Sequence, residues 1–422
     1  MTALAPQFTA PAIFSHTLAN GLVLVGEPTD AYQSAAFSFL IPAGCCYESR
    51  DRAGLSALTC EMMLRGAGSR DSRQLVSDLE NLGVERDEGV GVSQASYSAA
   101  TLGDNLFAAL EIYADLLRRP HLPKDQLDAG RQVCLLELRG VEDDPGQKLM
   151  IELRRRHYPD PWGRPSQGRA DSLQAATAND VRKFFATNYQ PAGTILAAAG
   201  NFDWPRLREQ VERLFGDWAP VKSAKLIDAE PANGVPHIPY ESTQSHIGIA
   251  FPSVPYRHPD YFQAWAAVGV LSGGMSARLF TEVREKRGLC YTVSASLQSQ
   301  RERGSVFCYA GTTAERAQET LDVTHAELVK LSAGIQQSEL DRLKARIKSS
   351  LIMQQESTSA RCSSLARDWY HLGRARTVTE VGKLVDDLSA NSINAYLAAN
   401  PPEDFTFLTL GPEPLEIPLG VS

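Results

Sequence analysis

Histidine and cysteine are the residue types in this sequence best suited to bind a metal ion. The chain holds eight histidines and seven cysteines, but no two histidines are three or four residues apart and no C-x-x-C pair occurs. Two imidazoles reach the same Zn²⁺ when they stand four residues apart on one helix face. The spacing therefore predicts neither a histidine-pair nor a C-x-x-C zinc motif.

The cysteines can also be considered as nucleophiles. Most of them lie in apolar runs, where a free cysteine behaves as a small hydrophobic residue, so we expect buried thiols and a reducing compartment. Thiol catalysis at Cys60 is one open hypothesis, and it needs both a base and a depressed pKa. No histidine lies near Cys60 in the sequence, so the base would have to come from a distant part of the fold.

The composition is that of a soluble globular protein with more than one domain. Of 422 residues, 43% are hydrophobic and 22% are charged, and the net charge is −8. No cluster of Lys and Arg indicates nucleic-acid binding, and no apolar run reaches the roughly 18 residues of a membrane span. Because Met1–Asn20 lacks a charged start followed by an apolar run, we expect a cytoplasmic protein, with the periplasm left open.

Two similar halves of the chain must position the functional side chains. In the first half, the alternation of Ala35–Pro42 predicts a strand, and Ser93–Leu102 resembles part of an antiparallel meander. Gly54–Arg65 has helical periodicity that ends at Gly66, and Gln126–Val141 is a longer helical stretch.

The second half repeats the order of strand, loop and helix. A strand is predicted at His246–Pro252 and a helix at Tyr261–Leu271, which Ser272-Gly273-Gly274 interrupts. The remaining predicted elements are a helix at Ser276–Arg287, a strand at Tyr291–Gln298 and a helix at Ser338–Gln355.

A segment with four prolines and no clear periodicity, Trp218–Pro239, lies between the halves and predicts a linker. The predicted organisation is an N-terminal domain at 1–218, a linker at 219–239 and a C-terminal domain at 240–422. Interleaved strands and helices with antiparallel meanders favour the α+β class over a doubly wound parallel sheet.

Five segments, in the expected order, resemble the pitrilysin/insulinase family of zinc peptidases. The most specific is Gly269–Leu297, GVLSGGMSARLFTEVREKRGLCYTVSASL, and the others lie at 53–70, 141–145, 188–203 and 356–367. The resemblance is to the short members, such as mitochondrial processing peptidase subunits, core subunits of the cytochrome bc1 complex and paired bacterial peptidases. It implies two homologous domains, each a mostly antiparallel sheet packed with helices, that form half of a clam-like chamber.

The same resemblance implies that the zinc motif of the family is lost. Catalytic members carry H-x-x-E-H on a helix, with a downstream Glu as third ligand. These positions fall on Ala57 for the first ligand, Cys60 for the general base and Glu61 for the second ligand. The third-ligand position falls on Glu137, which is alternatively a solvated helix carboxylate. We therefore expect no metal bound by this chain.

The resemblance also implies that a second functional feature of the family, a pair of Arg and Tyr residues, is kept. Arg284 and Tyr291 stand seven residues apart, as do the Arg and Tyr that reach the substrate in active members. Such a guanidinium can hold a substrate carbonyl, and the hydroxyl can donate to a developing oxyanion. The alternative is a solvated helix end and an ordinary strand aromatic. The loop Ser272-Gly273-Gly274 resembles the glycine-rich loop of the family, or is a simple turn.

The resemblance thus implies a non-catalytic subunit of a two-chain zinc peptidase. Its partner would be a homologous subunit with intact H-x-x-E-H that holds the zinc, and its substrate a peptide. In the family an edge strand pairs with the peptide, and the matching segment here is near Ser93–Leu102. A purely structural scaffold subunit and a peptide-binding homodimer stay open as alternatives.

Overall fold

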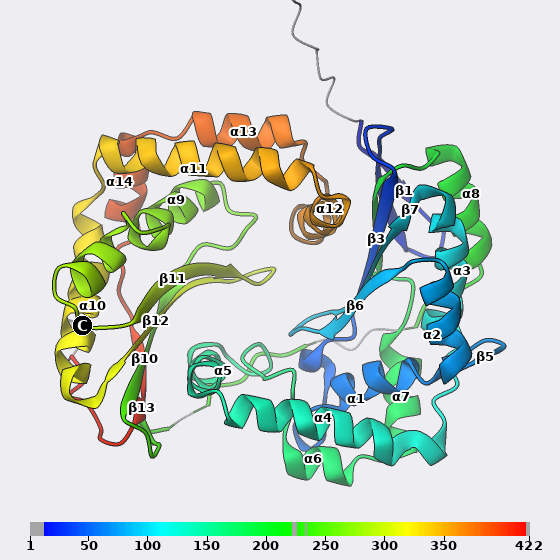
Figure 1. The fold of residues 1–422 in the computed structure, drawn as a ribbon, viewed down its shortest axis with the longest axis horizontal. Coiled ribbons are helices and arrows are strands. Elements are labelled where there is room, and N and C mark those ends of the chain that lie inside the picture. The colour runs from blue at the N-terminus through cyan, green and yellow to red at the C-terminus, as the bar shows by residue number, and fades with distance from the viewer. Residues whose placement is uncertain (1–11, 222–225, 233, 419–422) are drawn as a thin grey trace, which may run out of the picture. The chain divides into compact units, whose positions relative to one another are not determined.

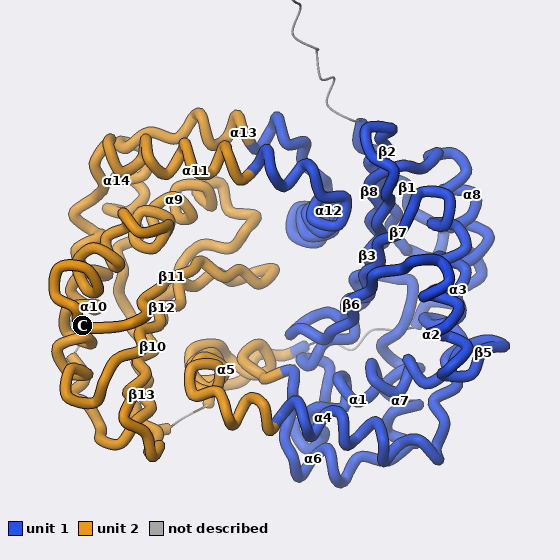
Figure 2. The backbone as a smooth tube through the Cα atoms, in the orientation of Figure 1, with its two compact units in different colours: residues 1–138, 166–226, 351–381 blue, residues 139–165, 227–350, 382–422 orange. Residues whose placement is uncertain are grey.

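The chain folds into two compact units, and each unit is made of three separate segments of the sequence rather than of one continuous half (Figures 1 and 2). The structure, a computed structural model, describes residues 12–221, 226–232 and 234–418. Unit 1 consists of residues 1–138, 166–226 and 351–381. Unit 2 consists of residues 139–165, 227–350 and 382–422.

A six-stranded sheet forms the centre of unit 1, in the order β1-β2-β8-β3-β7-β6. Only the β2–β8 pair is parallel. The strands of unit 1, including a separate short hairpin, are β1 (Phe14–Thr17), β2 (Val23–Pro28), β3 (Ser34–Ile41), β4 (Gly66–Ala67), β5 (Arg70–Asp71), β6 (Glu85–Val90), β7 (Ala95–Leu102) and β8 (Ile195–Gly200).

Helices cover both faces of this sheet. Side chains alternate across a strand, so Phe37 and Phe39 of β3 enter the large core beneath the helices on one face. Ala36 faces the other way and packs with Leu365 of α12. The helices of unit 1 are α1 (Leu55–Met63), α2 (Ser72–Asn81), α3 (Leu106–Arg118), α4 (Leu127–Glu142, in part), α6 (Ala170–Ala175), α7 (Ala178–Asn188), α8 (Trp204–Phe215) and α12 (Thr358–Leu372).

Unit 2 is built in the same way on a five-stranded sheet, in the order β11-β12-β10-β13-β9. Here α5 packs on β10 and β13, as α12 packs on β3 and β8 in unit 1. Its strands are β9 (His237–Pro239), β10 (Gln244–Ser253), β11 (Thr292–Ser299), β12 (Gly304–Thr313) and β13 (Thr406–Gly411). Its helices are α5 (Pro145–His157), α9 (Tyr261–Ser272), α10 (Ala317–Lys330), α11 (Gln337–Gln355, in part), α13 (Val378–Asp386, in part) and α14 (Ala390–Ala399).

The α+β class and the paired helix-covered, mostly antiparallel sheets are confirmed. The predicted strand Ala35–Pro42 is β3, and the predicted strand His246–Pro252 is β10. The helix expected at Ser276–Arg287 differs, because the described structure has a π-helical segment at Phe280–Glu285 instead of a continuous α-helix. The expected stop at Gly288 is present, with a φ of +60°.

Each unit takes one segment from the other half of the sequence (Figure 2). Residues 139–165, which contain α5, belong to unit 2, and residues 351–381, which contain α12, belong to unit 1. The division proposed from the sequence at 1–218 and 240–422 does not include this exchange. No helix among the described residues is long and apolar enough to cross a membrane.

The expected linker at 219–239 is only partly irregular. Residues 222–225 and 233 lie outside the described residues. Ala229 exchanges two backbone hydrogen bonds with Asp160, at 2.8 and 3.0 Å. His237–Pro239 forms β9, which pairs in parallel with β13.

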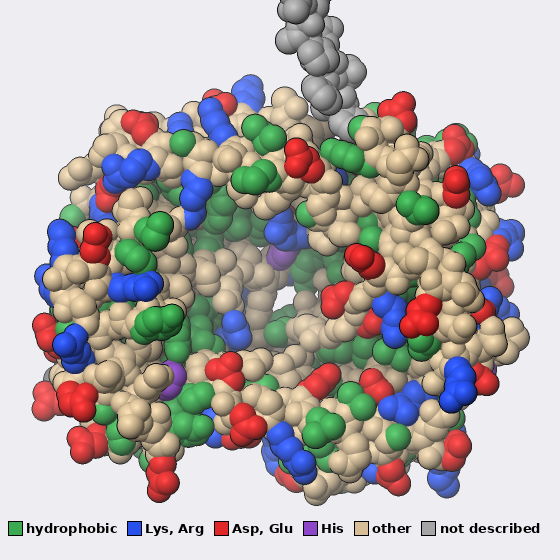
Figure 3. All heavy atoms as spheres, in the orientation of Figure 1, with side chains coloured by type: hydrophobic (Ala, Val, Ile, Leu, Met, Phe, Trp, Pro, Cys, Tyr) green, Lys and Arg blue, Asp and Glu red, His purple; other side chains and the backbone are tan. Residues whose placement is uncertain are grey.

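Charged side chains of both signs are intermixed on the molecular face that Figure 3 shows. Neither Lys and Arg nor Asp and Glu gather into one continuous patch on this face. All seven cysteines, expected as buried thiols, lie among the described residues and are buried without disulfide bonds.

Candidate functional site

The helix that carries the degenerate zinc motif is held by a buried carboxylate at its N-terminus. Glu48, only 5% exposed, accepts hydrogen bonds from the backbone N–H groups of Gly54, at 3.0 Å, and Ser56, at 2.7 Å. Gly54 has a φ of +95°, a conformation that favours glycine. A carboxylate is favourable at this end of a helix, because it satisfies free N–H groups and the positive end of the dipole.

The motif positions on α1 differ in their surroundings. Ala57 is half-buried and packs against the large core of unit 1. Cys60 is buried, and burial raises the pKa of its thiol to about 12. Its neighbour Tyr97 is also buried and forms a hydrogen bond of 2.8 Å with the hydroxyl of Tyr189. Glu61 accepts a hydrogen bond of 2.6 Å from the guanidinium of Arg65, one helical turn later.

The fourth motif position, Glu137 on α4, is brought close to Glu61 on α1. Partial burial and then the negative charge of Glu61 raise the pKa of Glu137. The two helices pack tightly, since a Cβ atom at Gly130 of α4 would lie 2.7 Å from the Sδ atom of Met62. The structure therefore places two of the three ligand positions of the family near one another.

These side chains do not suit a zinc ion. Ala57 has no donor atom, Glu61 is paired with Arg65, and the thiol of Cys60 is protonated at neutral pH, whereas zinc binds the thiolate. Across the described residues, no group of three or more His, Cys, Asp or Glu side chains is placed to hold a metal ion. The raised pKa of Cys60 also disfavours thiol catalysis, which requires a depressed one.

The Arg/Tyr pair comes together in unit 2. Arg284 lies in the π-helical segment, and Tyr291 immediately precedes β11, where its N–H bonds to the carbonyl of Gly311 at 3.1 Å. The guanidinium carbon of Arg284 lies 5.4 Å from the ring centroid of Tyr291 and 4.8 Å from that of Phe280. Tyr291 is 82% exposed. Both polar groups are therefore available to an external ligand.

The neighbouring cations behave differently from Arg284. Lys286 pairs with Glu282 at 2.7 Å, and Arg287 pairs with the same carboxylate at 3.1 Å. Within the described part of the chain, no carboxylate pairs with Arg284. Its position on two aromatic rings, without a counter-charge, distinguishes Arg284 from the solvated cations that surround it.

The glycine-containing loop is fixed to the sheet of unit 2 by its serine. The hydroxyl of Ser272, the last residue of α9, accepts a hydrogen bond of 2.8 Å from the N–H of Ala295 on β11. Gly274 has a φ of +153°, so the turn that follows α9 favours glycine here. The loop thus joins the helix end to an edge strand.

The prediction that Ser93–Leu102 forms an edge strand able to pair with a peptide is wrong, because this segment lies one position in from the edge of the sheet. The segment Ser93–Leu102 contains β7, but β7 lies between β3 and β6 and so has no free edge. The edge strand next to β7 is β6, whose sequence ERDEGV lacks the apolar alternation that identifies a half-buried strand. Its charges are the available signal, because exposed edge strands commonly carry them.

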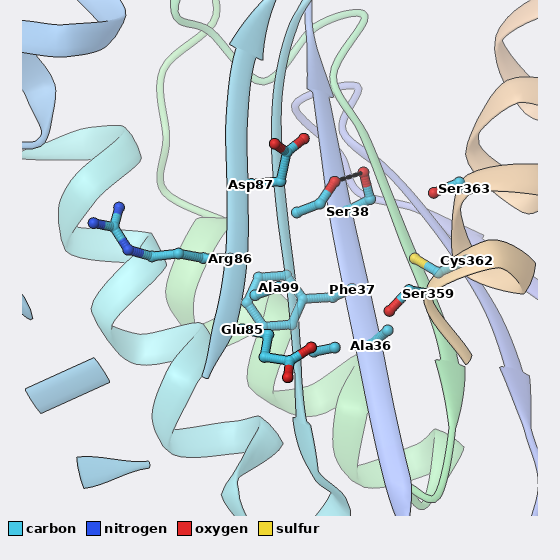
Figure 4. Close-up of a pocket in the computed structure, with 12 residues that line it drawn as sticks. Ala36, Phe37, Ser38, Glu85, Arg86, Asp87, Ala99, Ser359, Cys362 and Ser363 are labelled. Atoms are coloured by element: carbon cyan, nitrogen blue, oxygen red, sulfur yellow. Dashed lines mark hydrogen bonds between the residues drawn. The ribbon is translucent and has the colours of Figure 1, made fainter. Parts of the chain in front are cut away.

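A pocket of about 310 Å³ lies in unit 1 between the sheet and α12 (Figure 4). Its floor includes Ser38 and Ser98, whose hydroxyls are 2.8 Å apart. Figure 4 shows Glu85 and Asp87 of β6 on the sheet side and Ser359 and others of α12 opposite. The remaining lining residues are Ala36, Phe37, Arg86, Ala99, Ala100, Cys362 and Ser363.

Models of one protein family match most of the chain. The model described as "Insulinase (Peptidase family M16)" matches residues 24–160, and the one described as "Peptidase M16 inactive domain" matches residues 175–347. The first covers the degenerate motif on α1 and α4, and the second covers the Arg/Tyr pair.

Several bacterial relatives are similar over nearly the whole length of both chains. An uncharacterized zinc protease of Rickettsia felis is 24% identical, with 89% of this chain and 92% of that protein covered. An uncharacterized zinc protease of Mycobacterium tuberculosis is 28% identical, with 93% and 90% covered.

Solved structures share the fold at lower identity. A protease from Helicobacter pylori has a TM-score of 0.86 at 21% identity, with 96% of this chain and 100% of that chain covered. A peptidase M16 inactive domain from Pseudomonas fluorescens has a TM-score of 0.84 at 23% identity, with 97% and 100% covered. With the family models, these likenesses show that the chain belongs to the insulinase family, peptidase family M16.

Proposed function

We propose that this chain is the zinc-less subunit of a two-chain cytoplasmic peptidase, and that it acts on peptides together with a homologous subunit that carries H-x-x-E-H. The observation that carries the proposal is the exposed Arg284–Tyr291 pair, with which no carboxylate of the described residues pairs. On α1, in contrast, neither histidine of the family's zinc motif is present. A chain that had lost all peptidase function would have no use for these exposed donors. The family, and the relatives named as zinc proteases, support the proposal.

Each member of the pair has a distinct task in this proposal. The guanidinium of Arg284 holds a backbone carbonyl of the peptide, which aligns the scissile bond. The hydroxyl of Tyr291 donates a hydrogen bond to the oxyanion that develops on the reacting carbonyl. The zinc of the partner subunit would supply the activated water that attacks this carbonyl.

The test is reconstitution from two purified chains. Each chain alone should cleave a fluorogenic peptide slowly or not at all, and the mixture should cleave it with a rate that saturates at equal amounts of the two chains. Arg284→Ala should remove most of this activity. Arg287→Ala is the matched control, because it removes a neighbouring cation that is already paired with Glu282.

Three outcomes would contradict the proposal. If the mixture is active but Arg284→Ala and Tyr291→Phe leave its rate unchanged, the pair has no role in cleavage. If the chains associate and no mixture cleaves any peptide, the chain is a scaffold subunit. If instead it self-associates and binds peptides without a partner, it is a peptide-binding homodimer.

A further inference from the structure

A small cavity in unit 2 lies where the end of α9 meets one face of α11. Its volume is about 50 Å³, which suits a group of a few heavy atoms rather than a nucleotide. The lining combines small residues of α9 and the following loop with long polar side chains of α11. The lining residues are Gly269, Val270, Gly273, Ser276, Ala277, Glu339, Arg342, Leu343 and Arg346.

The guanidinium of Arg346 lies directly over the glycine loop. A Cβ atom at Gly273 would lie 2.7 Å from Nη2 of Arg346, and one at Gly274 would lie 3.4 Å from Nη1. The carbonyl of Gly269 would be still closer to a Cβ at Gly273, at 2.2 Å. The backbone contact with Gly269 therefore requires glycine at 273, and the guanidinium of Arg346 lies close beside this loop.

A second arginine, Arg342, lines the same cavity one helical turn earlier on α11. Like charges four residues apart on a helix repel each other. Among the residues that the structure describes, neither Arg342 nor Arg346 has a hydrogen-bond or ion-pair partner. The α11 stretch thus directs two unpaired guanidinium groups toward one small cavity.

The acidic residue of the cavity is already engaged elsewhere. Glu339 pairs with Arg278 through two hydrogen bonds, of 2.7 and 2.8 Å. One of its oxygens also accepts a hydrogen bond of 2.8 Å from the N–H of Gln336. The positive charges of Arg278 and Arg342 both act on Glu339. Because this single carboxylate is already bonded to Arg278, it does not compensate both Arg342 and Arg346.

We infer that this cavity is a binding site for an oxyanion, a carboxylate or a phosphate. The guanidinium groups of Arg342 and Arg346 supply forked donors that match two oxygens of such a group. The exposed hydroxyl of Ser276 adds a further donor at the rim. The site lies within unit 2 and uses neither Arg284 nor Tyr291, so it is independent of the function proposed above.

The test uses the full chain with sodium phosphate at constant ionic strength, adjusted with sodium chloride. Phosphate should raise the midpoint of thermal unfolding, because a ligand that binds the folded state stabilises it. Arg346→Gln and Arg342→Gln should each weaken phosphate binding by about ten- to a hundredfold, as expected for loss of a charge-assisted hydrogen bond. Both side chains are exposed, so the variants should fold.

Arg208→Gln is the matched control, since Arg208 is an exposed arginine on α8 of unit 1. A second arm compares a short peptide with a free C-terminal carboxylate and the same peptide as its amide. Displacement of phosphate by the carboxylate form alone would indicate a peptide terminus as ligand, and phosphate binding alone would indicate a free oxyanion. Equal phosphate binding by wild type, Arg346→Gln and Arg208→Gln, or no binding of either anion, would overturn the inference.

Discussion

The guanidinium of Arg284 lies 5.4 Å from the ring centroid of Tyr291, and the hydroxyl end of that ring is exposed. The pair is presented from two different elements, a π-helical segment and the residue before β11. Stacking limits the freedom of both side chains, so less entropy is lost when they bind a ligand.

The hydroxyl of Tyr291 can be tested apart from its ring. Tyr291→Phe retains the aromatic face beneath Arg284 and removes only the donor. In the reconstituted peptidase we expect kcat to fall by about 10²- to 10³-fold with a small change in KM, as for other oxyanion donors. Steady-state kinetics of the mixture measure this, with Lys286→Ala as control. A change in KM alone would indicate ground-state binding instead.

The degenerate motif should be repairable, because α1 and α4 still place two ligand positions near each other. In the double variant A57H/E61H, two imidazoles four residues apart would join Glu137 to give three zinc ligands. We expect one zinc per chain by metal analysis, whereas the wild type should bind none. The further variant Glu137→Gln should weaken zinc binding in this background by about tenfold or more. Absence of zinc from the double variant would mean that the helices no longer hold the required geometry.

Acid should destabilise unit 2 through its partly buried histidines. His157 is placed between the hydroxyls of Thr406, at 2.9 Å, and Ser305, at 2.8 Å, and burial lowers its pKa to about 4. The unfolded chain takes up a proton near pH 6.5, but the folded chain does so only near pH 4. Stability is therefore complete above pH 6.5 and falls as the pH drops toward 4, by about 2 to 3 kcal/mol.

The measurement is urea unfolding between pH 7.5 and 4. His157→Gln should reduce the dependence of the free energy of unfolding on pH, because glutamine does not titrate. The control is His258→Gln, at an exposed histidine of the same unit, which should leave this dependence unchanged. Burial also lowers the pKa of His237, His246 and His325, so some dependence of the same sign should remain in the variant. An unchanged slope in His157→Gln would contradict this assignment.

A buried ion pair attaches α12 to the sheet of unit 1. The guanidinium of Arg361 bonds to both carboxylate oxygens of Glu27, at 2.5 to 2.9 Å, and both residues are 8% exposed. Arg361→Ala should lower the free energy of unfolding by about 3 to 5 kcal/mol, because it leaves the Glu27 charge buried without a partner.

Hydrogen exchange across 351–381 should increase in the same variant. The double variant E27Q/R361M should lose less of the free energy of unfolding than Arg361→Ala, since no unpaired charge remains buried. Arg374→Ala, which breaks an exposed pair with Glu380, is the control and should cost less than about 1 kcal/mol. If Arg361→Ala and Arg374→Ala lower the free energy of unfolding equally, burial does not increase the cost of breaking the Glu27–Arg361 pair.

Elements with strong periodicity could be predicted closely from the sequence. The predicted helix Gln126–Val141 is α4 at Leu127–Glu142, because α4 presents a regular apolar face to the core. Edge strand β6 was missed, since its first four residues are charged and the segment carries no apolar alternation. The π-helical segment at Phe280–Glu285 was also missed, because its sequence has an ordinary helical pattern and the extra residue per turn depends on tertiary packing.

The motif positions Ala57, Cys60, Glu61 and Glu137 could be assigned to helices from the sequence, because α1 and α4 are regular, while the roles of the site residues stay predictions. The aromatic and charged neighbours of Arg284 and Tyr291 could not be assigned, since the π-helical segment and the strand are brought together only by folding. The exchange of α5 and α12 has the same cause. Local periodicity indicates that a helix forms but does not indicate which of two similar sheets it will cover.

The placement of α12 has a consequence for synthesis of the chain on the ribosome. Unit 1 has all of its strands once residue 200 has emerged, yet the helix that covers one sheet face begins at Thr358. At bacterial and eukaryotic elongation rates the delay is on the order of ten seconds. During this time Val25, Ala36 and Ala197 lack their cover. The nascent chain should therefore be a client for chaperones until its last helices are made.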